Sequence, residues 1–333
     1  MKKSTAAISK SLYSLFDLPT IDLIDRVGAM VSQESQSHYT KKDYLRPSSR
    51  DSHSRSKKCV TSAARAKIVR WLYDIVDYFE LERSTVAMAM SYADRFVSTP
   101  AGRTSRKDIT SFQLICLACL FLSTKTIDTT HLDVDLLVKA SIGCYDRQEI
   151  LGAEKQVLEA LNWRVCDVTS ACLSNHLLGL LIKVVPMDSL TLESLVDFTK
   201  FQIELSVAEY DTSVLRRPST VALAAVLNSM ELLDFTSGEK GIFHRVVQSM
   251  GLSFSSRVRE TSHLLNEVFD RQSEDMASRM SALDISYRSV DTSRTPLSLR
   301  TKKSALKCEP SPTCVDKAPL SLIRTSRRST SAR

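Results

Sequence analysis

The sequence is poor in glycine and has no glycine-rich loop. Only 8 of its 333 residues are glycine, and no two of them form a G-x-G or Walker-type pattern. Loops that hold phosphates need glycines where the backbone approaches the ligand closely. The motifs H-E-x-x-H and G-x-S-x-G are absent as well, and the 6 histidines are scattered. We therefore expect a protein that is not an enzyme, with no cofactor and no catalytic residues.

Long apolar runs are missing too. No stretch of about 18 consecutive apolar residues occurs, and the segment MKKSTAAISKSLYSLF lacks the continuous apolar part of a secretion signal. The 8 cysteines do not have the spacing of a disulfide framework, which fits a reducing compartment. These absences predict an intracellular protein with no membrane-spanning helix.

Two short patterns resemble metal sites, but each has a simpler explanation. Cys116 and Cys119 form a C-x-x-C inside the apolar run QLICLACLFL, where buried thiols of a helix core are the better interpretation. His131, Asp133 and Asp135 lie close together in HLDVD, but the intervening Leu and Val favour the start of a helix. The sequence predicts no metal site.

The net charge of +7 is distributed unevenly. Residues 271–333 carry +7, residues 41–58 carry +5, residues 1–40 are neutral, and residues 59–270 carry −5. Nucleic acid is therefore a disfavoured partner of the central part, because neutralising phosphates needs a cationic face. Basic clusters in the flanks suit nuclear import, so we expect the protein in the nucleus and cytoplasm; they are Lys57-Lys58, Lys302-Lys303 and Arg327-Arg328.

Apolar residues recur at helical spacing from residue 64 to residue 270, and the alternation typical of strands is absent. Five helical segments precede a short bridge at 163–168, and an amphipathic helix precedes them at 20–36. Five more segments follow the bridge, at about 169–185, 189–209, 217–234, 239–250 and 254–270. The sequence predicts an all-α protein built from two five-helix domains in tandem.

The domain division follows from these patterns. We expect an N-terminal helix and basic lead-in at 1–58, a first domain at 59–166 and a second domain at 167–270. Residues 271–333 contain 19 Ser/Thr and few apolar residues, which is typical of a disordered tail. Within this tail Thr295 and Ser311 each precede a proline and are candidate phosphorylation sites, although an unmodified tail fits the two dipeptides equally well.

Six segments carry a resemblance to the cyclin family. ARAKIVRWLYDIVDYFEL, SYADRFVS, FQLICLACLFLSTK and QEILGAEKQVLEALNWRV resemble the first, second, third and fifth helices of a cyclin box. HYTKKDYL is similar to the lead-in before the box, and ELSVAEYDTSVLRRPSTVALAA is similar to part of a second, C-terminal box. They occur in the family's order over about residues 38–230, so the two expected domains resemble an N-terminal and a C-terminal cyclin box.

The resemblance implies a regulatory subunit that binds and activates a cyclin-dependent Ser/Thr kinase in the cell cycle. It implies that Lys125 and Glu154 hold the kinase and that Arg65 and Asp94 form an ion pair between the first two helices. Three apolar residues near Lys125 and Glu154 would add contact area, with core packing as the competing interpretation: Phe121, Leu122 and Ile150.

A second implied site is a docking patch for substrates or inhibitors of the kinase. Its residues would be Ile68, Trp71, Asp74 and Gln113, of which Trp71, Asp74 and Gln113 are retained, whereas Ala64 and Lys67 weaken the apolar groove. Lys125 is followed by Thr126, Ile127 and Asp128 instead of an aromatic residue and two acids. The subtype stays open, and the alternatives are a transcriptional cyclin, a cyclin-fold transcription factor of TFIIB type, or a helical scaffold.

Overall fold

A computed structural model of the chain describes residues 10–46, 59–127 and 132–271. This part of the chain consists of α-helices, two short 3-10 turns and connecting segments, and it contains no strand. The first bundle consists of α3 (Ser62–Tyr78), α4 (Ser84–Ser98), α5 (Ile109–Ile127), α6 (Val134–Ala140) and α7 (Arg147–Ala160). The second comprises α8 (Ser170–Val184), α9 (Ser189–Ala208), α11 (Pro218–Leu232), α12 (Ser237–Ser249) and a helix over 256–271.

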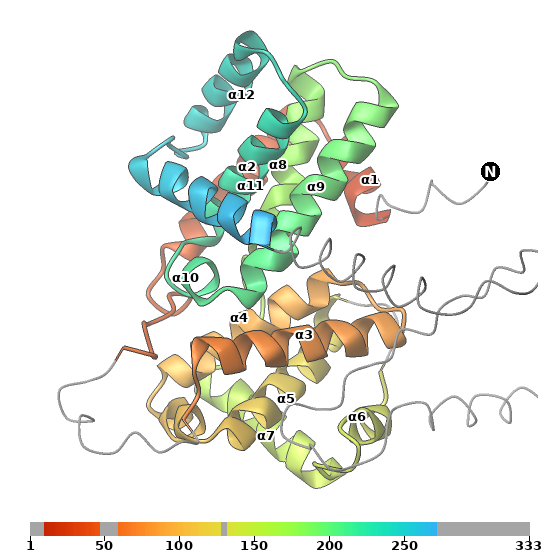
Figure 1. Cartoon of the computed structure of the whole chain (residues 1–333), viewed down its shortest axis with the longest axis vertical. Helices are drawn as coiled ribbons and strands as arrows, with labels where there is room; N and C mark the ends of the chain where they lie inside the picture. The colour runs from red at the N-terminus through yellow and green to blue at the C-terminus, as the bar shows by residue number, and fades with distance from the viewer. Residues whose placement is uncertain (1–9, 47–58, 128–131, 272–333) are drawn as a thin grey trace, which may run out of the picture.

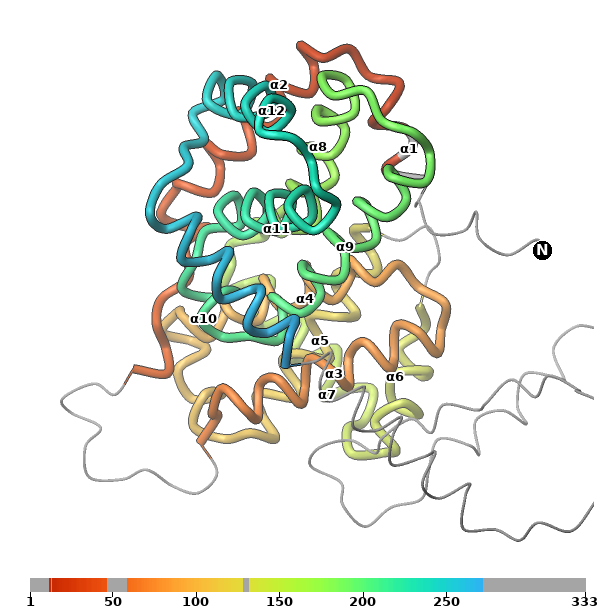
Figure 2. Tube along the Cα trace, turned by 45° about the horizontal axis from the view of Figure 1, so that its top comes forward, coloured from red at the N-terminus to blue at the C-terminus, as the bar shows by residue number. Residues whose placement is uncertain are grey.

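The two bundles lie one above the other, and each has its own apolar core (Figure 1). The N-terminal helices α1 (Lys10–Phe16) and α2 (Thr20–Glu34) pack against α8 of the second bundle, although they precede the first bundle in the chain. Figure 2 shows the same two-bundle arrangement from a second direction. The expectation of an all-α fold with two sets of five helices is confirmed. The position of the domain boundary stays a prediction, because side chains of α9 and α10 (Tyr210–Ser213) also contribute to the first core.

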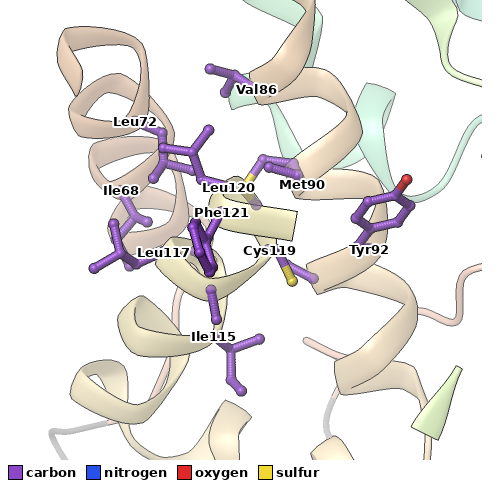
Figure 3. Packing of buried hydrophobic residues seen from close by; sticks show 14 of the residues in the cluster. Ile68, Leu72, Val86, Met90, Tyr92, Ile115, Leu117, Cys119, Leu120 and Phe121 are labelled. Atoms are coloured by element: carbon purple, nitrogen blue, oxygen red, sulfur yellow. The ribbon is translucent and has the colours of Figure 1, made fainter. Parts of the chain in front are cut away.

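Helix α5 is the centre of the first bundle. Its side chains point toward Ile68 and Leu72 of α3 on one side and toward Met90 and Tyr92 of α4 on the other (Figure 3). Helix α7 packs on it as well. By length and mean hydropathy (1.4) α5 would be able to cross a membrane, but 67% of the residues in that stretch are buried inside the bundle. Its apolar surface is therefore accounted for by neighbouring helices.

The helices begin where the sequence supplies capping side chains. Thr61 accepts a hydrogen bond from the Ala64 N–H at the start of α3. Asp146 and Glu149 form a reciprocal capping box at the start of α7, and the same arrangement occurs at the start of α12. Such caps satisfy backbone N–H groups that have no partner within the helix. Two elements are not expected from the sequence: the short helices α1 and α10.

Buried ion pairs occupy the seam between the bundles. Arg65 and Asp94 are both fully buried, with 2.8 Å between Nη2 and Oδ2, and Tyr44 donates a further hydrogen bond to Asp94. Burial alone would lower the pKa of Arg65, but the adjacent Asp94 more than offsets this effect and raises it. Nη1 of Arg65 donates to the carbonyl of Val207 at 2.7 Å, so the pair joins the first bundle to α9 of the second.

A second buried pair lies nearby, between Arg95 of α4 and Asp167 of the connecting bridge. Ser91 donates to the same carboxylate at 2.6 Å. Burial raises the pKa of Asp167, and Arg95 opposes that rise. Because a buried charge is costly without its partner, the Arg95–Asp167 pair fixes the bridge against α4.

Candidate functional site

Lys125 and Glu154 form an ion pair on the surface of the first bundle. Lys125 lies in the last turn of α5 and Glu154 lies in the middle of α7, and Nζ is 2.6 Å from Oε1. The lysine side chain is 43% exposed, whereas the glutamate side chain is only 10% exposed. The two helices thus present an accessible ammonium group above a mostly covered carboxylate.

The position of the Lys125 side chain is fixed by a second contact. Its Nζ lies 3.8 Å from the centroid of the Phe121 ring, one helical turn earlier. A cation over an aromatic face is attracted by the ring quadrupole, and a cation in the last turn of a helix also meets the negative end of the helix dipole. The side chain therefore has a preferred position before any partner binds.

The apolar residues implied by the resemblance are largely buried. Ile150 is completely inaccessible, so it is a core residue in this structure, and the expected direct contact with a partner is corrected for it. Phe121 and Leu122 are also buried, with only a small exposed fraction. The packing of α5 against α3, α4 and α7 explains this burial, since these side chains fill the space between the helices.

Two exposed apolar residues near the ion pair were missed by the sequence analysis. Leu151 is 38% exposed and lies three residues before Glu154 on α7, which places the two on neighbouring positions of one helix face. Ile127 is 37% exposed and follows Lys125 by two residues at the end of α5. We call Lys125, Glu154, Leu151 and Ile127 the α5–α7 notch. The signal in the sequence was the helical spacing of Leu151 and Glu154.

The expected docking patch is mostly closed. Ile68 and Gln113 are fully buried, Trp71 is nearly so, and Asp74 is half-buried. The indole N–H of Trp71 is buried and has no hydrogen-bond partner among the described residues. In this conformation Ile68 and Gln113 lie in the core of the first bundle, so neither is available for direct contact with a peptide.

The cysteines of the C-x-x-C are buried thiols. Cys116 and Cys119 lie inside α5 with no exposed surface, and burial raises the pKa of both thiols. A thiol that resists ionisation is a poor metal ligand and a poor nucleophile. Among the described residues no group of three or more His, Cys, Asp or Glu side chains is placed to hold a metal ion.

Several residues discussed from the sequence lie outside the described part of the chain. These are Asp128, His131, the candidate phosphorylation sites Thr295 and Ser311, and the basic pairs at 57–58, 302–303 and 327–328.

Comparisons with known proteins agree with this architecture. The family model described as "Cyclin, N-terminal domain" matches residues 27–166. Cyclin-A3-1 of Arabidopsis thaliana is 29% identical over 236 residues, which is 68% of this chain and 64% of the relative. Cyclin-B1-1 of the same plant is 26% identical over 210 residues, which is 63% of this chain and 44% of the relative. The chain thus spans between about half and two thirds of the length of these two relatives.

A solved structure gives the same result for the fold. The X-ray structure of a viral cyclin from herpesvirus saimiri superposes with a TM-score of 0.54, 17% sequence identity, and coverage of 75% of this chain and 97% of the viral one. Two tandem helical bundles of this kind define the cyclin fold. With the family match over residues 27–166 and the similarity to A- and B-type cyclins, the chain resembles a divergent member of the cyclin family.

Proposed function

We propose that this protein is a regulatory subunit that binds and activates a cyclin-dependent Ser/Thr kinase and so controls progression through the cell cycle. The observation that carries the proposal is the Lys125–Glu154 pair, held between two packed helices at the positions that the cyclin resemblance assigns to kinase binding. The protein itself performs no chemistry in this role.

The α5–α7 notch has the properties of a protein-binding surface. The accessible cation Lys125 and two exposed apolar side chains, Leu151 and Ile127, belong to helices that are fixed by a common core. Apolar contacts supply binding energy, while the charge selects and orients the partner. A regulator of this kind activates a kinase by binding its active conformation more tightly than its inactive one.

A charge exchange in the notch tests the proposal. The double variant Lys125→Glu/Glu154→Lys keeps an ion pair between α5 and α7, so the fold is expected to persist while the charges presented to the kinase are reversed. We expect loss of kinase co-purification and of the associated phosphotransfer to a Ser-Pro peptide. The matched control exchanges an exposed pair of the same bundle, Arg147→Asp/Asp135→Arg, whose side chains are 2.8 Å apart. Equal kinase recovery with the double variant and the control would contradict the proposal.

A single substitution tests the apolar part of the notch. Leu151→Asp places a charge on an exposed position, so the free energy of unfolding should change by less than about 0.5 kcal/mol. Kinase affinity should fall about tenfold or more, as for a residue near the centre of an interface. Unchanged affinity, measured by titration with the kinase, would remove Leu151 from the proposed surface.

We also propose that the basic flanks direct the protein to the nucleus. Removal of residues 271–333 should then shift a fluorescent fusion toward the cytoplasm without reducing kinase binding. Loss of kinase binding on this truncation would show that the tail takes part in the interface.

A further inference from the structure

A polar cavity lies at the seam between the bundles, away from the α5–α7 notch. Its volume is about 190 Å³, and its walls come from the end of α2, residues 39–41, α4, the bridge, the α10–α11 connector and the start of the helix at 256–271. Residues 39–41 form a strap that follows α2. This strap, α10 and the start of the last helix lie along the same side of the molecule (Figure 1). Segments from both bundles and from the N-terminal part of the chain thus share one cavity.

The acidic residues of the cavity are already satisfied within the protein. Asp167 is paired with Arg95 and accepts a hydrogen bond from Ser91 at 2.6 Å. Glu34 at the end of α2 accepts hydrogen bonds from the Ser219 N–H, at 2.9 Å, and from the Ser219 hydroxyl group. Neither carboxylate therefore needs one of the remaining cations of the cavity as its partner.

The basic residues of the cavity outnumber these acids. Lys41, Arg216, Arg217 and Arg257 line it, and Arg216 is paired with the carboxylate of Glu260 at 3.2 Å. In the described part of the chain, Lys41, Arg217 and Arg257 have no carboxylate oxygen within 4.0 Å. The charge of Arg217 lowers the pKa of Glu34, but from a distance greater than 4.0 Å.

Lys41 is the deepest of these cations. It is half-buried, and its Nζ donates to the carbonyl of Ser213 at 3.0 Å, which turns the ammonium group toward the seam. Arg217 and Arg257 lie exposed at the rim. Charges of one sign around a concave, partly desolvated surface reinforce one another and attract an anion. An anion there would offset the positive charge of the three.

We propose that this cavity binds the phosphoryl group of a phosphorylated Ser or Thr in a peptide. Lys41, Arg217 and Arg257 come from three separate segments, so they would approach a ligand from three directions. This arrangement suits a tetrahedral dianion with several oxygens better than a planar carboxylate with a single charge. Arginine guanidinium groups bind phosphoryl oxygens through bidentate hydrogen bonds. The part of the cavity that the phosphoryl group does not fill would hold water, at about 30 Å³ per molecule.

Occupation of the site would have a structural consequence. The three cations belong to the strap after α2, to the connector before α11 and to the last helix. A phosphoryl group bound to all three would join these segments across the seam, and binding to the folded state alone raises the unfolding temperature.

The test uses the full chain and two forms of one short peptide, with phosphoserine or with unmodified serine between alanines, at constant ionic strength. At saturating concentrations the phosphorylated form should raise the unfolding temperature by about 2–4 °C, and the unmodified form should not. The double variant Arg217→Gln/Arg257→Gln should lose this shift. The matched control is Arg259→Gln, an exposed arginine of the same helix that does not line the cavity.

Both substituted arginines are exposed and have no ion-pair partner among the described residues, so the double variant should fold, which circular dichroism checks directly. A third arm uses inorganic phosphate as the probe. Stabilisation by inorganic phosphate but not by the phosphopeptide would overturn the assignment to a peptide. Equal shifts with both peptides, or a shift that persists in the double variant, would overturn the site itself.

Discussion

The two bundles share a layout but differ in how they place polar groups. The buried polar groups of the first bundle include two ion pairs at the seam, Arg65–Asp94 and Arg95–Asp167. Between α9 and α11 of the second bundle the buried polar contacts are neutral. Thr199, Gln202, Asn228 and Ser229 form a buried network of hydroxyl and amide groups between α9 and α11.

The ends of the central helices differ as well. Helix α5 ends near the cation Lys125, which is paired with α7, whereas α11 ends near the anion Glu231. The same helical framework thus carries opposite charges at comparable points.

The largest expected effect comes from the buried pair of the first bundle. Arg65→Ala leaves the Asp94 carboxylate buried without its cation, and the free energy of unfolding should fall by about 3–5 kcal/mol. Denaturant unfolding measures it, with Arg70→Ala, an exposed arginine of the same helix, as the control. The double variant Arg65→Ala/Asp94→Ala should lose less than the sum of the single losses. An Arg65→Ala protein as stable as the control would show that the pair has no such role.

The neutral network of the second bundle should show a smaller loss. Asn228 donates to Gln202 at 2.9 Å and to the Ser262 carbonyl at 3.1 Å, so Asn228→Ala leaves buried acceptors without donors. We expect the free energy of unfolding to fall by about 1–3 kcal/mol. The exposed Asn266→Ala on the neighbouring helix is the matched control. If Asn228→Ala cost as much as Arg65→Ala, the contrast between charged and neutral polar groups would disappear.

Among these contacts, the surface ion pairs of Arg83, which link the two bundles, should contribute least to the free energy of unfolding. Arg83 contacts Asp77 of the first bundle at 2.5 Å and Glu204 of the second at 2.7 Å, and all three side chains are partly exposed. Arg83→Gln should cost at most about 1 kcal/mol, and the loss should shrink as salt is added. A loss that is independent of salt would point to packing of Arg83 over the Tyr73 ring instead.

A pH series should add a small effect of known sign at Glu34. Burial raises the pKa of Glu34, and its bonds to Ser219 only partly oppose that rise. The contribution of Glu34 to the free energy of unfolding is therefore complete at pH values below the pKa that Glu34 has in the unfolded chain. It decreases as the pH rises through the higher pKa that Glu34 has in the folded protein. Glu34→Gln removes this decrease, so its stability relative to the unmodified protein should improve from about pH 4 to pH 7. An opposite trend in urea unfolding would contradict the raised pKa.

Local patterns in the sequence predicted most of the helices, because helical periodicity and capping residues act over a few residues. The resemblance of the segments around Lys125 and Glu154 to cyclin helices singled out these two residues, and the structure brings them together as an ion pair. Leu151 was missed because its exposure depends on how α7 packs on α5. Ile150 was expected to contact a partner for the same reason, since periodicity alone does not show which apolar residues stay accessible.

The contacts that the N-terminal segment makes across the seam were beyond prediction from the sequence. Glu34 and Ser219 are 185 residues apart, and Lys41 and Ser213 are 172 apart, so no local pattern links them. Helix α1 is only seven residues long and packs against α8, where Leu15 and Leu23 lie beside Gly179. Trp163 is 69% exposed in a left-handed turn after α7, although its apolar character would favour burial.

The reach of Arg65 into α9 has a consequence for how the protein can be divided. Its guanidinium group needs Asp94 from one bundle and the Val207 carbonyl and Ser213 hydroxyl from the other. A fragment ending at the bridge would lose these two partners and expose the surface around the guanidinium group, and the complementary fragment would expose the surface that covered it. The bundles are therefore expected to melt in a single transition, and separately expressed halves should be recovered mainly as aggregates unless they are produced together.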